Sequence, residues 1–233
     1  NMKPSTEILA ELSAMKDETY RVFNERIVNI PAGSSLGVRT PGVRAYGKQL
    51  IKEEGFVLDA LLAFPDDLFE IRLLKCFAVG MVRMPFEEKI SYIERCLPVV
   101  DGWAVCDLFC STLKEVKKHR AAFLPYIETY VAEGSEFSQR FGYIMLLGCY
   151  MQAEYLPAIF RLLDGAKSEH YYAHMGAAWL LAEVLTRFFA EGVRYLQKGA
   201  LAQKSKKKAV QKARESFRVS EEQKNYLKDL KIC

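Results

Sequence analysis

A tryptophan and a carboxylate one helical turn apart are the residues whose types and spacing best suit chemistry. They are Trp103 and Asp107, and residues four apart share one face of a helix. Asp101 precedes them as a predicted N-cap that accepts a hydrogen bond from the first turn. An aromatic wall beside a fixed negative charge suits a site that handles a cationic ligand. A tryptophan packed in the core beside a surface acid gives the same pattern, so both interpretations stand on these residues alone.

The basic residues gather near the C-terminus. The chain has 233 residues and a net charge of +4, but residues 194–218 hold nine basic side chains against Glu215 alone. This segment therefore carries +8 and the remainder of the chain carries −4. A concentrated basic surface favours a polyanionic partner, most often nucleic acid, although many such runs are only solvated helix faces.

Helices are predicted for the elements that position these residues. Two helices are predicted over 2–15 and 16–27, followed by an extended connection at 29–35. Thr40 is the predicted N-cap of the next helix, because Pro41 suits its first position, and Gly55 ends it. A capping box at 220–223 opens a last helix that runs to Lys231.

Helix-start signals recur along the middle of the chain with spacings of 35, 34, 33 and 37 residues. They stand at Asp66, Asp101, Ser135, Ser168 and Ser205. Each of the first four precedes a long apolar helix, over 68–81, 103–113, 137–150 and 171–189, and shorter helices are predicted over 86–97, 123–131 and 155–163. The repeat predicts one all-α domain over 1–233, a HEAT-like solenoid of about five to six helix pairs.

A solenoid aligns equivalent positions of successive repeats. Arg72, Asp107 and His174 each lie six residues after a predicted cap, and Arg140 lies five after Ser135. We expect this row to line a concave groove in which basic residues contact phosphates. Alternatively, each is a lone polar residue on an exposed helix face.

Four stretches resemble the AlkD-type alkylpurine DNA glycosylases. The first is residues 37–41, Gly-Val-Arg-Thr-Pro, and the second is Asp101-Gly102-Trp103 with Asp107. The others are Gln139-Arg140 and Tyr171-Tyr172 with Trp179, and Arg214-Glu215 adds weaker support. Their order and helical-repeat context, over residues 5–218, carry the resemblance more than any single motif does.

The resemblance implies a solenoid that grips duplex DNA and excises cationic N3- or N7-alkylpurines without flipping the base into a pocket. Trp103 and Trp179 match the two tryptophans that face the deoxyribose, Asp107 matches the catalytic carboxylate, and Arg140 matches a groove arginine. A cationic purine leaves readily, so no strong general acid is required. Two π-faces and one carboxylate would stabilise the oxocarbenium-like sugar, and the carboxylate would also hold the attacking water.

The chain departs from active members of the family at three places. Where they carry a short helix that enters the minor groove, residues 29–35 include Pro31 and Gly33, which do not sustain a helix. Ala182 replaces an arginine three residues after the second tryptophan, and His174-Met175 replaces a Gln-Lys pair. The sequence is therefore similar to a branch that lacks the minor-groove helix.

No metal or cofactor is predicted. His170 and His174 are four apart without a third ligand, and Cys106 and Cys110 lack zinc-site spacing. The six cysteines are interpreted as small, reduced hydrophobes. The chain has no run of about 18 apolar residues and no signal-peptide pattern, so we expect a cytoplasmic protein that does not enter membranes.

The sequence therefore predicts a monomeric, monofunctional glycosylase of alkylated double-stranded DNA. The alternatives are a weak or inactive DNA-binding paralogue, or a helical-repeat scaffold with an apolar groove lined by Met or Leu that binds protein. The predicted catalytic residues are Trp103, Asp107 and Trp179. The residues predicted to contact DNA are Arg39, Arg72, Arg140, His174, Lys206, Lys207, Lys208, Lys212 and Arg214.

Overall fold

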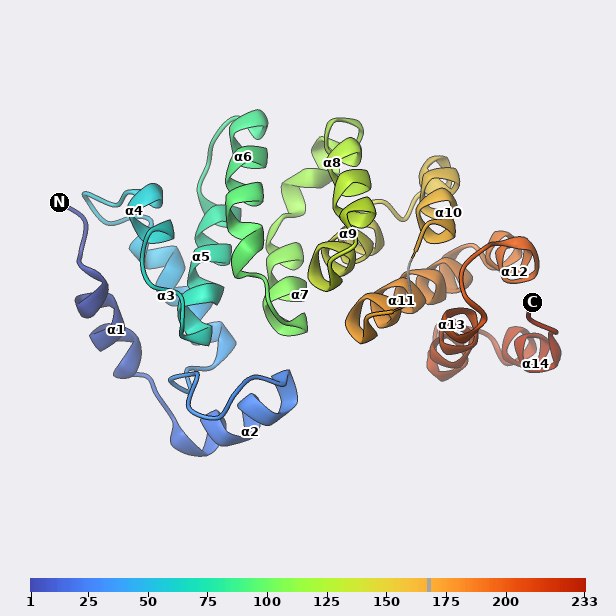
Figure 1. Ribbon diagram of the computed structural model, residues 1–233, viewed down its shortest axis with the longest axis horizontal. Coiled ribbons are helices and arrows are strands. Elements are labelled where there is room, and N and C mark those ends of the chain that lie inside the picture. Colours follow the sequence, from blue (N-terminus) through green and yellow to red (C-terminus); the bar gives the residue numbers. More distant parts are fainter. Residues whose placement is uncertain (167–168) are drawn as a thin grey trace. The chain divides into compact units, whose positions relative to one another are not determined.

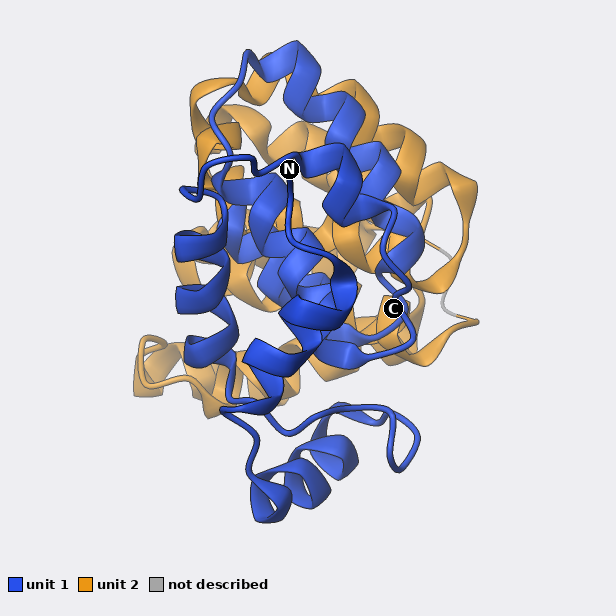
Figure 2. Ribbon diagram, turned by 90° about the vertical axis from the view of Figure 1, so that its left-hand side faces the viewer, with its two compact units in different colours: residues 1–113 blue, residues 114–233 orange. Residues whose placement is uncertain are grey.

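The computed structural model describes residues 1–166 and 169–233, and within these ranges every regular element is a helix (Figure 1). The chain forms two compact units, residues 1–113 and 114–233, coloured separately in Figure 2. The all-α prediction is confirmed for the described residues. None of their helices is long and apolar enough to cross a membrane.

Unit 1 is built around α5, which contacts α3, α4, α6 and α7. Its helices are α1 (Ser5–Ser13), α2 (Glu18–Val28), α3 (Thr40–Leu50), α4 (Leu58–Leu62), α5 (Phe69–Met81), α6 (Phe86–Cys96) and α7 (Trp103–Thr112), with the 3-10 turn η1 (Leu97–Val99) before α7. Every residue from Phe69 to Val79 is buried, because neighbouring helices cover α5 on several sides. Figure 1 shows α3, α5, α6 and α7 side by side.

Helices α5 and α7 run in the same direction and approach closely at both ends. Their first turns are joined by an ion pair between Arg72 and Asp101, with Nε and Oδ1 3.2 Å apart. At the other end, a Cβ added to Gly80 would lie 2.3 Å from Cγ2 of Thr112. A glycine is therefore required there, and the close contact fixes the position of α7.

Unit 2 is built around α11, which packs against α9, α12 and α13. Its elements are η2 (Lys114–Lys118), α8 (Arg120–Glu133), α9 (Glu136–Cys149), η3 (Ala153–Tyr155), α10 (Leu156–Asp164), α11 (Tyr171–Arg187), α12 (Phe189–Lys198), α13 (Gln203–Glu215) and α14 (Glu221–Asp229). The helix predicted over 171–189 is α11, which ends at Arg187, and a further helix, α12, starts at Phe189 after Phe188 leaves the helical conformation.

Several predicted caps are wrong, although the helices beside them form. The N-cap of α3 is Arg39 rather than Thr40, α5 begins at Phe69 after the N-cap Leu68 rather than after Asp66, and the N-cap of α7 is Gly102. Asp101 makes no capping bond because its carboxylate pairs with Arg72.

Among the caps predicted later in the chain, some are confirmed and others are wrong. Ser135 is the N-cap of α9, but its hydroxyl hydrogen-bonds with the Glu133 carboxylate instead of capping. Ser205 lies inside α13, and Ser168 falls outside the described residues. The capping box of Ser220 and Gln223 is confirmed.

Five cysteines are buried, as expected of small hydrophobes, and only Cys233 is exposed. All six carry free thiols.

Candidate active site and nucleic-acid interface

The Trp103–Asp107 pair lies on the partly exposed face of α7. Both side chains are half-buried, whereas Ala104, Val105 and Cys106 between them are buried. Trp103 is therefore not a core tryptophan, and its indole and the Asp107 carboxylate are one helical turn apart on a face that reaches solvent.

The start of this helix is held by Arg72 and Asp101. Arg72 is 8% exposed, and its Nη1 donates a hydrogen bond of 2.8 Å to the carbonyl of Asp66 while Nε faces Asp101. The guanidinium is thus buried and bound to groups of the protein. Arg72 positions the site's helix, and its burial argues against the predicted contact with phosphate.

Trp179 lies in unit 2, on α11, with 39% of its surface exposed. It borders a hollow of about 250 Å³ between α11 and the region of α13, lined by Trp179, Ala182, Glu183, Thr186, Lys212, Glu215, Ser216 and Arg218. Ala182 is one of the lining residues and is itself buried. Lys212, predicted from the basic run, shares the hollow with the tryptophan.

Glu183 was missed by the sequence reasoning. It follows Trp179 by four residues, the same spacing as Trp103 and Asp107, and that spacing is the signal that could have found it. Its carboxylate accepts two hydrogen bonds from Arg218, of 2.9 and 2.7 Å. The negative charge beside Trp179 is therefore neutralised by a fixed cation.

Arg140 and His174 are tied into unit 2. Arg140 is 6% exposed, donates a 3.0 Å hydrogen bond to the carbonyl of Tyr172, and lies 5.9 Å from that ring. His174 Nδ1 is 2.6 Å from the hydroxyl of buried Ser205. Burial and the nearby Lys204 and Lys208 lower the pKa of His174, so its ring is neutral at pH 7.

The basic segment divides into buried and exposed parts. Lys206 is 1% exposed, and its Nζ donates a 2.6 Å hydrogen bond to the carbonyl of Gly199. Lys207 and Arg214 are exposed, and Lys208 and Lys212 are half-buried. The outer face of α13 is therefore basic without Lys206, which we leave out of the proposed DNA contacts.

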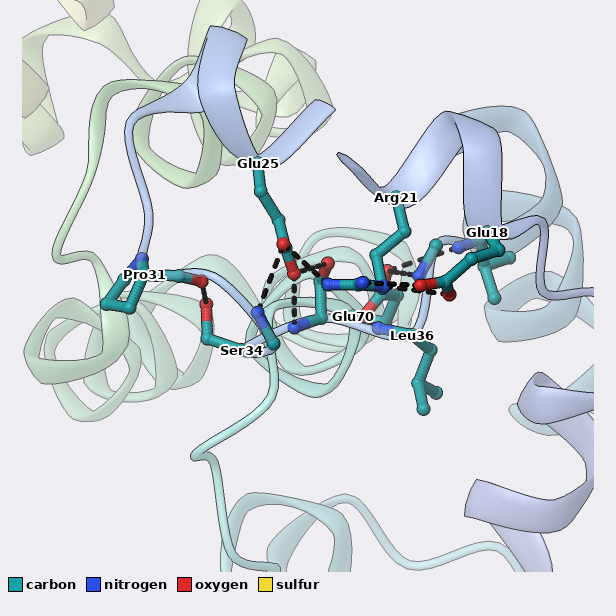
Figure 3. Close-up of polar contacts among 11 residues, drawn as sticks. Glu18, Arg21, Glu25, Pro31, Ser34, Leu36 and Glu70 are labelled. Atoms are coloured by element: carbon teal, nitrogen blue, oxygen red, sulfur yellow. Dashed lines mark hydrogen bonds and ion pairs between the residues drawn. The ribbon is translucent and has the colours of Figure 1, made fainter. Parts of the chain in front are cut away.

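The connection before α3 is not helical, as predicted, and two carboxylates hold it (Figure 3). Glu70 accepts hydrogen bonds of 2.8, 3.0 and 3.2 Å from the backbone N–H groups of Leu36, Gly37 and Val38. Gly37 adopts a φ of +86°, and a Cβ there would lie 2.5 Å from the carbonyl of Asp17. Only glycine fits this turn.

Glu25 binds the other half of the connection. It accepts hydrogen bonds from the N–H groups of Gly33 and Ser35 (both 3.1 Å), from the Ser35 hydroxyl (2.6 Å) and from Arg21 (2.8 Å). Burial alone raises the pKa of Glu25, but these hydrogen bonds outweigh it and hold the pKa below its ordinary value. These hydrogen bonds hold the segment in a defined, non-helical conformation.

Arg39 ends this loop as an exposed residue. Its guanidinium pairs with Asp17 at 3.1 Å and stacks 4.8 Å from the ring of Tyr20.

The predicted site residues are brought together within each unit. Within unit 1 the structure brings together Trp103 and Asp107, and within unit 2 it brings together Trp179 and Lys212. Convergence of all predicted site residues on one groove stays a prediction.

The described residues thus form an all-helical protein with a half-exposed tryptophan on α7, another on α11, and basic residues on the exposed face of α13. The family model of the DNA alkylation repair enzymes matches residues 8–217. The chain therefore belongs to the DNA alkylation repair enzyme family, as its resemblance predicted. A search of the curated proteins found no match.

Proposed function

We propose that this protein is a monofunctional DNA glycosylase that hydrolyses the N-glycosidic bond of cationic N3- or N7-alkylpurines in duplex DNA. The observation that carries the proposal is the half-exposed Trp103–Asp107 pair in a chain of this family. We further propose that the chain is a HEAT-like solenoid and that Arg140 and Trp179 take part in holding the lesion.

The chemistry needs little acid catalysis, because an alkylated purine leaves as a neutral base. The carbon–nitrogen bond breaks first, and positive charge develops on the sugar. The Asp107 carboxylate opposes that charge and accepts a hydrogen bond from the attacking water, whose proton it then takes. The indole of Trp103 adds a π-face to the cation's environment.

The second tryptophan plays a parallel part in this proposal. Trp179 offers an exposed π-face, but its neighbouring Glu183 is already paired with Arg218. Asp107 is therefore the carboxylate assigned to the sugar cation, and Trp179 is assigned to packing against the lesion's deoxyribose. Arg140 would donate to a phosphate only through the part of its guanidinium that Tyr172 leaves accessible.

A weak or inactive DNA-binding paralogue is the second candidate function. The specific observation in its favour is the loop over 29–39, which Glu25 and Glu70 hold in a non-helical form. Family members that insert a helix into the minor groove anchor the lesion with it, and this chain has no such element there. Excision is therefore expected to be slow even if the chemical groups are in place.

The deciding experiment is single-turnover release of N7-methylguanine from a duplex carrying one such lesion, at saturating protein. We expect release above the spontaneous rate, with Asp107→Asn as the matched control. Release by wild type that equals the spontaneous rate would leave the paralogue as the function, provided that the same duplex is bound.

A further inference from the structure

A large groove in unit 1 takes no part in the proposed chemistry. It has a volume of about 1100 Å³, at the upper end of the roughly 300–1,000 Å³ of small-molecule sites. Helix α3, the segment after it and the end of α5 line it, through Thr40, Pro41, Arg44, Ala45, Lys48, Ile51, Lys52, Phe56, Met81, Val82 and Arg83. Neither Trp103 nor Asp107 is among these residues, so the groove is a separate surface.

The floor of the groove is apolar. Ile51, Phe56, Met81 and Val82 are half-buried, which leaves part of each side chain open to the groove. A methionine and aromatic floor of this kind adapts to the side chains of a protein ligand. Phosphodiester backbone carries no apolar group that would use it.

The rim of the groove is uniformly basic. Arg44, Lys48, Lys52 and Arg83 line it, and no carboxylate does. Across the described residues none of these four pairs with a carboxylate, and the Arg44 guanidinium is held 4.5 Å from the Phe77 ring. Unneutralised cations around an apolar floor attract a ligand that is both acidic and amphipathic.

We propose that this groove docks an acidic, amphipathic helical segment of a partner protein. The partner's apolar side chains, spaced at i, i+3, i+4 and i+7, cover Ile51, Phe56 and Met81, while its carboxylates meet Lys48, Lys52 and Arg83. The mode is that of a helix laid in a groove. Charge complementarity and the apolar floor together favour this occupant over DNA, which matches the rim alone.

Ala45 gives the sharpest test. It is exposed on α3 and lines the groove, so a larger helix-forming residue there leaves the core untouched. Ala45→Glu adds a negative charge to the groove, and Ala45→Gln adds the same bulk without charge. The probe is a fluorescein-labelled peptide of about 14 residues, or four helical turns, with Leu and Phe on one face and Glu on the other.

Fluorescence anisotropy would measure binding of this peptide, of a scrambled peptide of the same composition, and of an unmodified DNA duplex. We expect the ordered peptide to bind wild type, Ala45→Glu to weaken it about tenfold or more, and Ala45→Gln to weaken it less than about threefold. The double variant Lys48→Glu/Lys52→Glu should weaken peptide binding about tenfold or more as well. Lys207→Glu/Lys208→Glu, on α13, should keep peptide binding and weaken the duplex.

Three outcomes would overturn the proposal. The first is no preference for the ordered peptide over the scrambled one. The second is an equal decrease of peptide affinity in the α3 and α13 variants, which would mean non-specific attraction to basic surfaces. The third is weaker duplex binding in Lys48→Glu/Lys52→Glu with peptide binding unchanged, which would make the rim a DNA surface. Because base release is not measured, failure of the glycosylase proposal leaves this test intact.

Discussion

Buried charged side chains organise unit 1 of this protein. Glu70 and Arg72 lie on the same buried helix, where Glu70 binds three backbone N–H groups and Arg72 binds Asp101. Lys75, on the same helix, donates to the carbonyls of Leu62 and Phe64. Through these contacts α5 fixes the segments that lead into α3 and α7.

At Asp107 the proposed chemistry can be separated from binding. Asp107→Asn keeps the shape of the side chain but removes the charge that opposes the sugar cation. We expect single-turnover release of N7-methylguanine to fall by ~10²–10³. Duplex affinity, measured by anisotropy, should stay within about twofold, because the charge acts on the transition state. An unchanged release rate would remove Asp107 from the mechanism.

Trp179 should matter less than Asp107. Trp179→Ala removes one π-face, and cation–π interactions contribute about 0.5–2 kcal/mol, or roughly two- to thirtyfold in rate. Trp179→Phe keeps a smaller π-face and is expected to fall between the alanine variant and wild type. If the alanine variant releases base at the wild-type rate while Asp107→Asn does not, Trp179 lies away from the lesion.

Glu25 predicts a pH dependence of stability. Because its pKa is lowered on folding, its contribution is complete above the ordinary value of 4.5 and is lost as pH falls through the folded pKa. Glu25→Gln removes the charge that Arg21, Gly33 and Ser35 share, and should lower the free energy of unfolding at pH 7 by about 1.5–3 kcal/mol. Urea unfolding at pH 7, 5 and below 4 should show a flatter pH profile for the variant. A parallel profile would contradict the assignment.

Among the elements, helices were predictable, but several of their first residues were not. Apolar periodicity identified α5, α6, α7, α9 and α10, but the caps at Thr40 and Asp101 were assigned wrongly. A carboxylate before a helix can cap that helix or form an ion pair elsewhere. Asp101 forms an ion pair with Arg72, which lies 29 positions earlier and which no local pattern connects to it. Short α4 lacks enough turns to show a period, and no helix is predicted for α12, which begins where the helix predicted over 171–189 ends.

In α13 the helical spacing of Lys206 indicates that it is buried, although the segment's basic composition suggests an exposed residue. Lys206 lies three, four and seven residues before Ala209, Val210 and Ala213, all buried, so it shares their face. Counted as one of nine basic residues, it was assigned to DNA. Its place on the helix makes it a structural lysine instead.

The buried position of Lys206 gives a prediction for the element. Lys206→Met keeps the length of the side chain but leaves the carbonyl of Gly199 without its 2.6 Å donor. We expect a decrease of about 1–3 kcal/mol in the free energy of unfolding, measured by urea titration. The neighbouring exposed variant Lys207→Met is the matched control and should change stability by less than about 0.5 kcal/mol. Equal effects would mean that Lys206 is solvated.

At the scale of the whole molecule, charge separates the proposed roles. Residues 194–218 carry +8 while the rest carries −4. The exposed basic residues of this segment lie on α13, where they include Lys207 and Arg214, and also on α12, as Arg194 and Lys198. The recurring helix-start signals predicted that the described residues are helical, because each helix–turn–helix repeat buries an apolar helix face in the same way. Contacts such as the Arg72–Asp101 ion pair depend on long-range packing that no local pattern encodes.

The salt dependence of duplex binding tests whether this basic face meets DNA. Replacing Lys207, Lys208 and Arg214 with Gln should weaken binding to all duplex sequences alike. The slope of log affinity against log salt should flatten by about 0.9 for each phosphate that the variant no longer neutralises, because neutralised phosphates release condensed counterions. Lys48→Gln/Lys52→Gln removes charge from the α3 groove and should leave the slope unchanged, and Lys206→Met should also leave it unchanged. If the α13 variant keeps the wild-type slope while the α3 variant flattens it, DNA binds unit 1 and the basic face of α13 is only solvated.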